Sequence, residues 1–533
     1  MKKRILSAVV AATLMLTAFT GCKYNDPGAD GASADKTLII GAATDLKTLD
    51  TGKMYEVYGN MIAYATYDML FRIEGTDMAN PKPSLTTDQW TLDEKTHTVY
   101  TFPIREGVKF TSGNPLTAKD VVWTINRVIN LKSNTKQHVA GIKSVEAKDD
   151  MTVVITLKEP DASFLTKLAS NAFCILDSEL LKKNGGTDAA DAWSADKAEA
   201  FLNSHSAGSG PFTLDHWTPS SELVLNKNKD YWGQTGNVEK IIIKEIPDAN
   251  TQIQMLEKNE IDIALSLNPD NIAQLQNNNN VQILKSQTAV SSFLIMNNDP
   301  KIGGPVANAD VQQAIRYAID YKGLKQMCGE GATLPLSFVP QGFVGAKTRS
   351  DDYRDLTKAK ALMKKAGYEK GFEIELTAAN FESEGMKWTD IAQKIQNDLK
   401  EIGITVKIKT AEFSVILDPY RKGELPFLVM HWSPDYYDIN NQLAFLPGDT
   451  VGERAKWSAK GHDDMIELGN KIIGESDNAK RAQYSQQLQD LMAENSPYAF
   501  LLQHPKTYAA SKRLTNVVYN DLSKIQLTEV NIG

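Results

Sequence analysis

The chain has 533 residues, more than one hydrophobic core usually fills, so we expect about two to four lobes. Its formal net charge is −8 at pH 7, and the three cations near its start leave the remainder more acidic still. Because nucleic acid is held by a basic face that neutralises phosphates, this charge argues against nucleic acid as a partner. Three scattered cysteines are too few for a disulfide framework or a zinc site with paired cysteines.

A secretory signal opens the chain. Basic residues at positions 2–4 precede an apolar stretch over residues 5–20, which ends just before Cys22. This stretch is shorter than the roughly 20 apolar residues of a membrane span, as is typical of a signal peptide that is cleaved off. The cysteine at the cleavage point resembles the lipobox of bacterial lipoproteins, although Phe19 stands where a lipobox usually has leucine. We expect removal of residues 1–21 and a lipid anchor on Cys22; the alternative is ordinary cleavage that leaves Cys22 an incidental thiol.

Beyond the signal, the sequence predicts a tether and then the first strands. Residues 22–36 are rich in glycine, alanine, aspartate and serine and show no apolar periodicity, which indicates a flexible segment. An apolar run predicts a strand at residues 37–40. Alternation predicts another strand at residues 100–104, where Pro103 indicates an edge position or a bulge.

Helices are predicted between the strands. Capping patterns mark two helix starts, at Thr117 with an aspartate three positions on and at Asp310 with a glutamine three positions on. Apolar residues lie on one helical face over residues 388–402, Gly403 suits a left-handed C-terminal position, and residues 404–408 then alternate as a strand. Helices interleaved with short strands indicate α/β layers.

No constellation of side chains indicates catalysis or a resident metal. The seven histidines show no short ligand spacing, so we expect no metal site. The chain lacks the G-x-S-x-G elbow, the H-E-x-x-H motif, a Walker loop and a dinucleotide fingerprint, so we expect no enzyme and no cofactor. Cys174 and Cys328 either pair in an oxidising exterior or remain two buried thiols.

A series of motifs occurs in a fixed order between about residues 37 and 510. They are YDMLFR at 67–72, REGVKF at 105–110, SGNPLTAKDVV at 112–122, GSGPF at 208–212, NKNKDYW at 226–232, VQQAIRYAID at 311–320 and AKALMKKAGY at 359–368. This ordered set resembles the extracellular solute-binding proteins of the oligopeptide and dipeptide ABC importers, bacterial solute-binding protein family 5. Most of these residues suit turns or core positions, so the motifs identify a family rather than a site.

The resemblance implies an α/β, two-lobed, periplasmic-binding-protein-like fold of the type II, Venus flytrap kind, with an additional α/β lobe. Lobe I would consist of residues 37–57, 205–290 and 504–533. The additional lobe II would be residues 58–204, and lobe III, residues 291–503, would close over the ligand.

The segment HWSPDYYD at residues 431–438 carries the ligand contacts that the resemblance implies. In peptide-binding relatives, the residue that matches Asp435 accepts the ligand's α-ammonium group. The residues that offer backbone groups to the peptide match His431, Trp432 and Ser433. This arrangement is physically reasonable, because peptides of arbitrary sequence share only a backbone and charged termini, so a receptor has to treat them as an added strand with one fixed end.

Several assignments remain open at this point. The resemblance implies that the segment Asp45, Leu46 and Lys47 pairs with the peptide from the other lobe. Taken alone, the local sequence favours a helix N-cap or a solvated loop acid for Asp435, and only the resemblance reverses this. Trp432 is either a core residue or part of the pocket lining. The residue that binds the ligand's carboxylate is unassigned, because Val429 stands where some relatives carry a basic residue; Arg421 is one candidate.

We therefore expect an extracytoplasmic, lipid-anchored monomer that captures short peptides between its lobes and delivers them unchanged to an ABC permease in the membrane. Two alternatives stay open. The same fold could bind another solute, either a nickel chelate or an oligosaccharide on which tryptophans stack, or the protein could be a surface receptor for signalling peptides.

Overall fold

The computed structural model describes residues 36–44, 46–56 and 58–533. Cys22 and Asp45 lie outside these ranges, so the lipid anchor and one of the expected ligand contacts stay predictions. In the described part of the chain, no helix is both long enough and apolar enough to cross a membrane. Residues 37–533 form one unit, and the description below concerns that unit.

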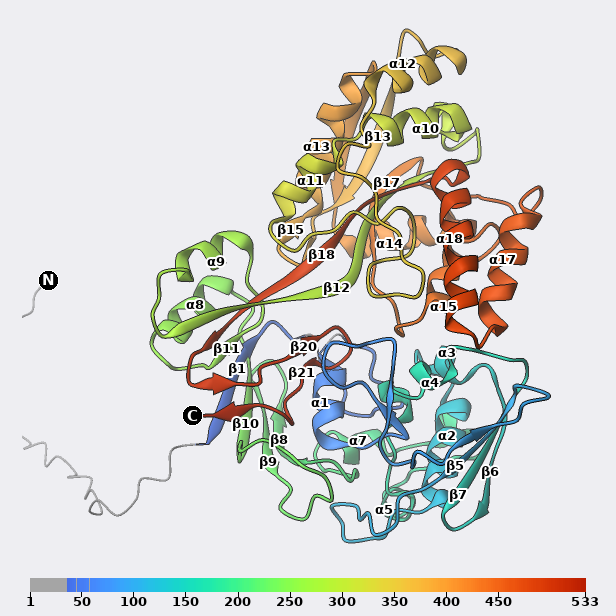
Figure 1. Cartoon of the computed structure of the whole chain (residues 1–533). Coiled ribbons are helices and arrows are strands. Elements are labelled where there is room, and N and C mark those ends of the chain that lie inside the picture. Colours follow the sequence, from blue (N-terminus) through green and yellow to red (C-terminus); the bar gives the residue numbers. More distant parts are fainter. Residues whose placement is uncertain (1–35, 45, 57) are drawn as a thin grey trace, which may run out of the picture. The chain divides into compact units, whose positions relative to one another are not determined.

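A ten-stranded mixed sheet runs through the unit (Figure 1). Its strands follow the order β16-β13-β17-β12-β18-β11-β1-β10-β9-β8. The strand predicted at residues 37–40 is β1, which pairs in parallel with β10 and β11. The bounds of the ten strands are β1 Thr37–Ala42, β8 Phe212–Thr218, β9 Glu222–Lys227, β10 Lys240–Glu245, β11 Ile263–Ala264, β12 Val281–Met296, β13 Phe372–Ala379, β16 Ile404–Ala411, β17 Phe427–Trp432 and β18 Tyr498–Ser511.

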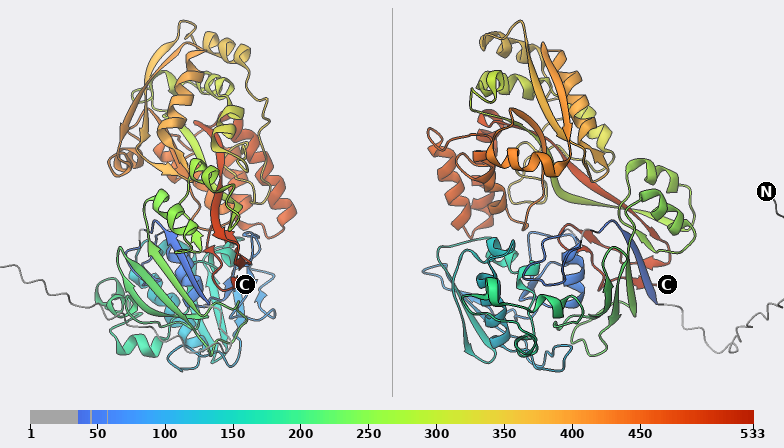
Figure 2. Two further views of the ribbon diagram at one scale, coloured as in Figure 1. Left: turned by 90° about the vertical axis from the view of Figure 1, so that its left-hand side faces the viewer. Right: turned by 180° about the vertical axis from the view of Figure 1, so that it is seen from behind.

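Two long strands, β12 and β18, join the two ends of this sheet. They pair antiparallel from Val281 opposite Ser511 onward, with an irregular register between Gln287 and Ser291. At about 3.4 Å per residue, the 16 residues of β12 span about 50 Å. Figures 1 and 2 show from several sides that the two strands stay side by side along this length. The β12–β18 pair therefore connects the two ends of the sheet.

A separate four-stranded antiparallel sheet has the order β4-β5-β7-β6. Its elements and the helix packed on it are β4 Thr91–Leu92, β5 Val99–Pro103, β6 Ile142–Asp149, β7 Thr152–Leu157 and α2 Ala118–Leu131. The predicted capping box of α2 is confirmed, since the Thr117 N–H donates to Asp120 Oδ2 at 3.0 Å. The expectation of an edge position for β5 is wrong: β5 is an inner strand. Its Pro103 is tolerated because β4 pairs only with Tyr100 and Thr101.

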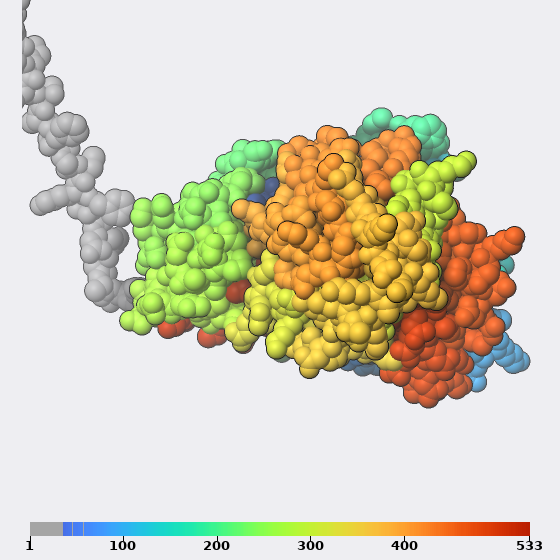
Figure 3. Space-filling view, turned by 90° about the horizontal axis from the view of Figure 1, so that it is seen from above, coloured from blue at the N-terminus to red at the C-terminus, as the bar shows by residue number. Residues whose placement is uncertain are grey.

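Helices between β12 and β18 cover the other end of the large sheet, and this part of the chain makes up most of the face seen in Figure 3. The main ones are α10 Ala309–Ala318, α11 Tyr321–Cys328, α12 Leu356–Lys365, α13 Trp388–Lys400, α14 Phe413–Lys422, α17 Asp463–Gly474 and α18 Asn478–Asn495. The predicted start of α10 is wrong by two residues, because the side chain of Asn308 caps the helix by accepting the N–H of Asp310 at 2.9 Å. The pattern around Gly403 is confirmed: its φ is +87°, and β16 begins at the next residue.

The largest hydrophobic core fills the space between these helices and strands β12, β17 and β18, with Trp388 and Phe293 at its centre. Cys174 and Cys328 are both buried free thiols, which decides between the two alternatives for them. Burial raises the pKa of Cys328 to about 12, so its thiol stays protonated. The lobe boundaries expected from the resemblance stay a prediction.

Candidate functional site

A cavity of about 360 Å³ is lined by three of the residues that the sequence singles out, His431, Ser433 and Asp435. This volume is within the range of about 300 to 1,000 Å³ that is usual for small-molecule sites. Its walls come from the loop before α1 (Gly59–Thr66), from α3 (Lys136–Val139), from β12, from the hairpin of β14 (Glu382–Ser383) and β15 (Met386–Lys387), from the segment after β17, and from the turn between β20 (Tyr519–Asn520) and β21 (Lys524–Ile525).

Asp435 lies in this cavity with its carboxylate largely free. Its backbone N–H donates to the side-chain oxygen of Asn441 at 3.2 Å, which fixes the loop. Among the described residues, the one hydrogen bond to its carboxylate comes from the hydroxyl of Tyr55, at 2.6 Å. Burial, together with the negative charge of Asp435, raises the pKa of Tyr55 to about 12, so Tyr55 remains a donor. No cation of the described chain pairs with Asp435, and its remaining lone pairs are available to a ligand.

His138 lines the same part of the cavity. It is only 4% exposed, its ring meets that of Tyr436 edge to face, and its Nδ1 has no partner in the described structure. Burial lowers the pKa of His138 to about 4, against the opposing influence of Asp435. The imidazole is therefore neutral at physiological pH and does not supply the positive charge that Asp435 lacks.

His431, Trp432 and Ser433 end strand β17. Here β17 pairs with β12, His431 opposite Ser292 and Trp432 opposite Ser291. On its other side β17 pairs with β13 at Leu428, before the segment that reaches the cavity. His431 and Ser433 line the cavity, whereas Trp432 packs edge-on against Phe445 in the core and does not. Its placement favours the core interpretation that the sequence left open.

The predicted partner segment does not reach this cavity in the residues described. Leu46 packs against a hydrophobic core, and Lys47 is exposed. The cavity wall from this part of the chain is formed instead by Tyr55 and Glu56. Sequence reasoning missed both of them. The signal available in the sequence was a large aromatic residue, Tyr55, in a polar segment; in the structure this residue is 51% exposed.

The hairpin of β14 and β15 brings Glu384 to the cavity wall. Glu384 and Gly385 form its two-residue tip, with φ of +47° and +81°, a pair of positive values that fits a type I′ turn. Lys506 Nζ lies 2.8 Å from Glu384 Oε2. Burial by itself would raise the pKa of Glu384, but the ammonium of Lys506 outweighs it and lowers the pKa, so this pair is charged on both sides.

Asp521 and Lys524 close the cavity at the turn between β20 and β21. Asp521 accepts hydrogen bonds from the N–H of Ala289 at 2.5 Å and from the hydroxyl of Tyr437. Burial raises the pKa of Asp521. Lys524 Nζ lies 3.8 Å from Asp521 Oδ1. Among the described residues, no group of three or more His, Cys, Asp or Glu side chains is arranged to hold a metal ion.

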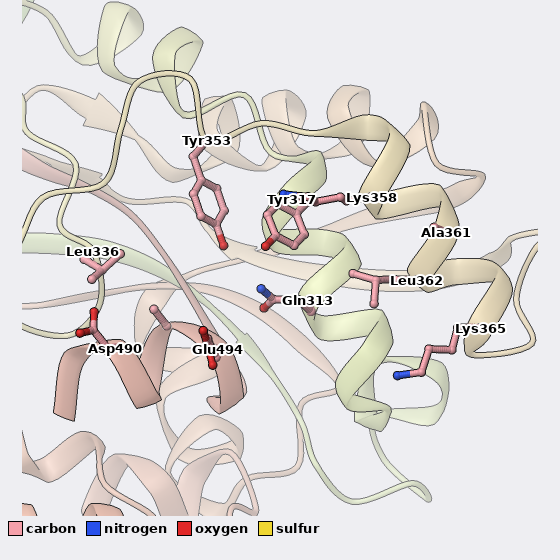
Figure 4. Close-up of a pocket in the computed structure, with 11 residues that line it drawn as sticks. Gln313, Tyr317, Leu336, Tyr353, Lys358, Ala361, Leu362, Lys365, Asp490 and Glu494 are labelled. Carbon is pink, nitrogen blue, oxygen red and sulfur yellow. The ribbon is translucent and has the colours of Figure 1, made fainter. Parts of the chain in front are cut away.

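A larger cavity of about 740 Å³ lies between α10, α12 and α18 (Figure 4). It contains none of the residues predicted for the site. Its polar lining combines the lysines Lys358 and Lys365 with the acids Asp490 and Glu494. We therefore regard the smaller cavity around Asp435 as the candidate site.

Comparison with known proteins identifies the family and the fold. The model of the bacterial extracellular solute-binding proteins, family 5 Middle, matches residues 80–453. The probable D,D-dipeptide-binding periplasmic protein DdpA of Escherichia coli (strain K12) is 26% identical over 504 residues, covering 93% of this chain and 94% of that protein. The dipeptide-binding protein of the same strain is 28% identical over 473 residues, covering 84% and 85%. The structure of HbpA2 from Haemophilus parasuis is similar with a TM-score of 0.79 at 24% identity, covering 93% of this chain and 100% of that one. The predicted mixed α/β binding-protein fold is thereby confirmed.

Proposed function

The chain belongs to the bacterial extracellular solute-binding proteins, family 5, and we propose that it captures short peptides in the cavity around Asp435 and delivers them to an ABC permease. The observation that carries the proposal is the Asp435 carboxylate, which lines the cavity without an ion-pair partner from the described chain. Two relatives named for dipeptide binding, DdpA and the dipeptide-binding protein, support the same class of ligand.

The α-ammonium group of a peptide supplies what Asp435 lacks. A hydrogen bond between charged groups contributes about 1.5 to 3 kcal/mol, and its effect is greatest where the site excludes water. Tyr55 already donates to Oδ1, so an ammonium group can occupy the other lone pairs without displacing it. His138, which lines the same part of the cavity, is neutral and so does not compensate the negative charge of Asp435 before a ligand binds.

The end of β17 can accept the peptide backbone. Because β13 pairs with β17 at Leu428 only, the edge near His431 and Ser433 is available for an added strand. Such pairing recognises main-chain groups regardless of sequence. We assign backbone contacts to His431 and Ser433, and an indirect role to Trp432, which fixes the strand by packing in the core. Asp45, Leu46 and Lys47 stay proposed contacts from the opposite side.

Calorimetric titration tests the ammonium assignment. Trialanine and N-acetyl-trialanine are titrated into the wild-type protein and into Asp435→Asn. We expect acetylation to weaken wild-type binding at least tenfold, and to make little difference in Asp435→Asn, whose affinity for the free peptide is already low. Asp418→Asn is the matched control, because Asp418 is exposed and pairs with Lys422 on its own helix. Equal wild-type affinity for both peptides would contradict the proposal.

Three further parts of the proposal concern the whole protein. We propose that the mature chain is a monomer anchored through lipid on Cys22, which the mass of its N-terminal peptide checks. We propose that the ligand is released unchanged, and sustained appearance of peptide fragments would contradict this. Permease and ATPase genes beside the gene for this protein would support delivery to an ABC importer.

We also propose the lobe boundaries given by the resemblance, with closure about β12 and β18. Support for the boundary of lobe III comes from the cores, since one hydrophobic cluster uses only residues between 289 and 502, whereas another cluster joins residues of the expected lobes I and II. Small-angle scattering with and without trialanine is the measurement. A radius of gyration that does not fall on binding would contradict closure.

A further inference from the structure

Lys524 is the one cationic side chain that faces this cavity in the described part of the chain. The other ionisable groups of the wall are carboxylic acids, tyrosines and the histidines His138 and His431, whose pKa values burial lowers to about 4. The side chain of Lys524 is only 11% exposed. An ammonium so far removed from solvent requires acceptors, because it carries three N–H donors.

The described residues do not supply those acceptors within hydrogen-bonding distance. Among the described residues, the ammonium of Lys524 makes no hydrogen bond, and its ion pair with Asp521 is long, at 3.8 Å. Oδ2 of Asp521 accepts the N–H of Ala289 and the hydroxyl of Tyr437, and Oδ1, the oxygen nearer Lys524, accepts the hydroxyl of Tyr519 at 3.4 Å. Lys506 gives the internal comparison: it is equally buried, but it donates to Glu384 at 2.8 Å. Lys524 thus lies at the cavity without a hydrogen bond from the described residues, whereas Lys506 has a close carboxylate partner.

The backbone holds Lys524 in an uncommon conformation. Its φ is +56°, a left-handed value that a residue with a side chain adopts at a cost. The side chain of Asn520 maintains the turn by accepting the N–H and the hydroxyl of Ser523, at 2.7 Å and 2.9 Å. Asn520 and Lys524 face each other across the two-stranded β20–β21 pair. The strained position directs an ammonium group at the cavity.

We propose that Lys524 binds the C-terminal carboxylate of the captured peptide. This inference rests on the proposed function, and it names the anchor that sequence reasoning left unassigned. Asp435 and Lys524 line one cavity of about 360 Å³, so both charged ends of the ligand are enclosed together. The protein therefore selects short peptides with two free termini, and a chain that has to leave the cavity at either end binds poorly.

The test combines variants of the protein with variants of the peptide. Trialanine, its C-terminal amide and N-acetyl-trialanine are titrated calorimetrically into the wild type, Lys524→Met and Lys524→Arg. We expect amidation to weaken wild-type binding at least tenfold but less than twofold in Lys524→Met, with discrimination partly kept in Lys524→Arg. Lys422→Met, an exposed change on α14, is the matched control and should behave as the wild type.

The outcomes separate this inference from the proposed function. If the wild type binds trialanine and its amide equally, or if Lys524→Met still discriminates tenfold, the assignment to Lys524 is wrong while peptide capture stands. If acetylation has no effect in any variant, or no peptide binds the wild type, the proposed function fails and the inference with it. An Ala-Ala-Asp amide that binds as tightly as trialanine would show a side-chain carboxylate at Lys524, and would overturn the C-terminal assignment.

Discussion

Arg127 holds the loop that carries Tyr55 to the cavity, so replacing it tests how the fold positions the site. Its guanidinium donates to both oxygens of Asp50, at 2.8 Å and 2.7 Å, and to both oxygens of Asp196, at 2.9 Å and 2.8 Å. All three side chains are completely buried. The carbonyl of Asp50 in turn accepts the N–H groups of Lys53 and Met54, each at 2.8 Å, which places the turn immediately before Tyr55.

Arg127→Met keeps most of the volume but leaves two buried carboxylates without their cation. Removing one partner of a buried ion pair costs about 3–5 kcal/mol. Unfolding entropy is about 2.1 cal/mol/K per residue, so a unit of about 500 residues loses about 1 °C of melting temperature for each kcal/mol. We expect the melting temperature of Arg127→Met to fall by about 3–5 °C if the unit unfolds in one step, and peptide affinity to fall as the Tyr55 loop loosens.

Scanning calorimetry at pH 7 is the assay, and Lys119→Met on the same helix is the control. Lys119 pairs with Asp150 at 2.8 Å, but both side chains are more than two-thirds exposed, and such pairs contribute little to stability. Its melting temperature should stay within about 1 °C of the wild type. Equal shifts in the two variants would refute the argument that the buried ion pairs, rather than helix α2 in general, hold this part of the fold.

Three further outcomes follow from single contacts. Tyr55→Phe removes the hydroxyl that donates to the Asp435 carboxylate. Because Tyr55 is half exposed, we expect a loss of about 1 kcal/mol of binding free energy, a roughly fivefold loss of trialanine affinity by calorimetry. Unchanged affinity would contradict this. His504 is fully buried, and burial lowers its pKa from 6.5 to about 4. As the pH falls from 6.5 to 4, the unfolded chain therefore takes up a proton that the folded chain does not, which lowers the free energy of unfolding by roughly 3 kcal/mol. We expect His504→Gln to remove this part of the pH dependence in urea titrations, whereas His97→Asn, at an exposed histidine, should leave it unchanged. Gly403→Ala forces a β-carbon onto a φ of +87° and should lower the free energy of unfolding by about 1–2 kcal/mol, unlike Gly141→Ala, where the backbone is ordinary and the space open.

The parts of the fold that the sequence predicts are those with local, repeating physical causes. The buried face of α13 is predictable because its buried residues recur every three or four positions. Its C-terminal end is predictable because Gly403 is followed by an alternating strand. The capping box at Thr117 needs only residues three apart. The start of α10 was missed because two capping residues, Asn308 and Asp310, compete within one turn, and local sequence does not decide between them.

The site was less predictable, because loops bring its walls together over long separations. Asp435 was found through the resemblance, whereas Tyr55 depends on the contact between Arg127 and Asp50, 77 positions apart, which leaves no periodic trace. Lys524 depends on a turn held by one asparagine side chain near the end of the chain. Each of these residues looks like an ordinary surface residue in the sequence, and only the fold determines that it faces the cavity.

The charges of the cavity connect ligand capture with closure. An empty closed cavity holds the Asp435 carboxylate with only Tyr55 as its donor and the Lys524 ammonium with no hydrogen bond from the described chain. Desolvating unpaired charges is costly, so closure without a ligand is unfavourable compared with an open state in which water solvates both groups. A zwitterionic peptide supplies both counter-charges at once, and therefore stabilises the closed form by its differential affinity for it. If Asp435 and Lys524 bind the peptide as proposed, the same two groups also disfavour the closed form of the empty receptor.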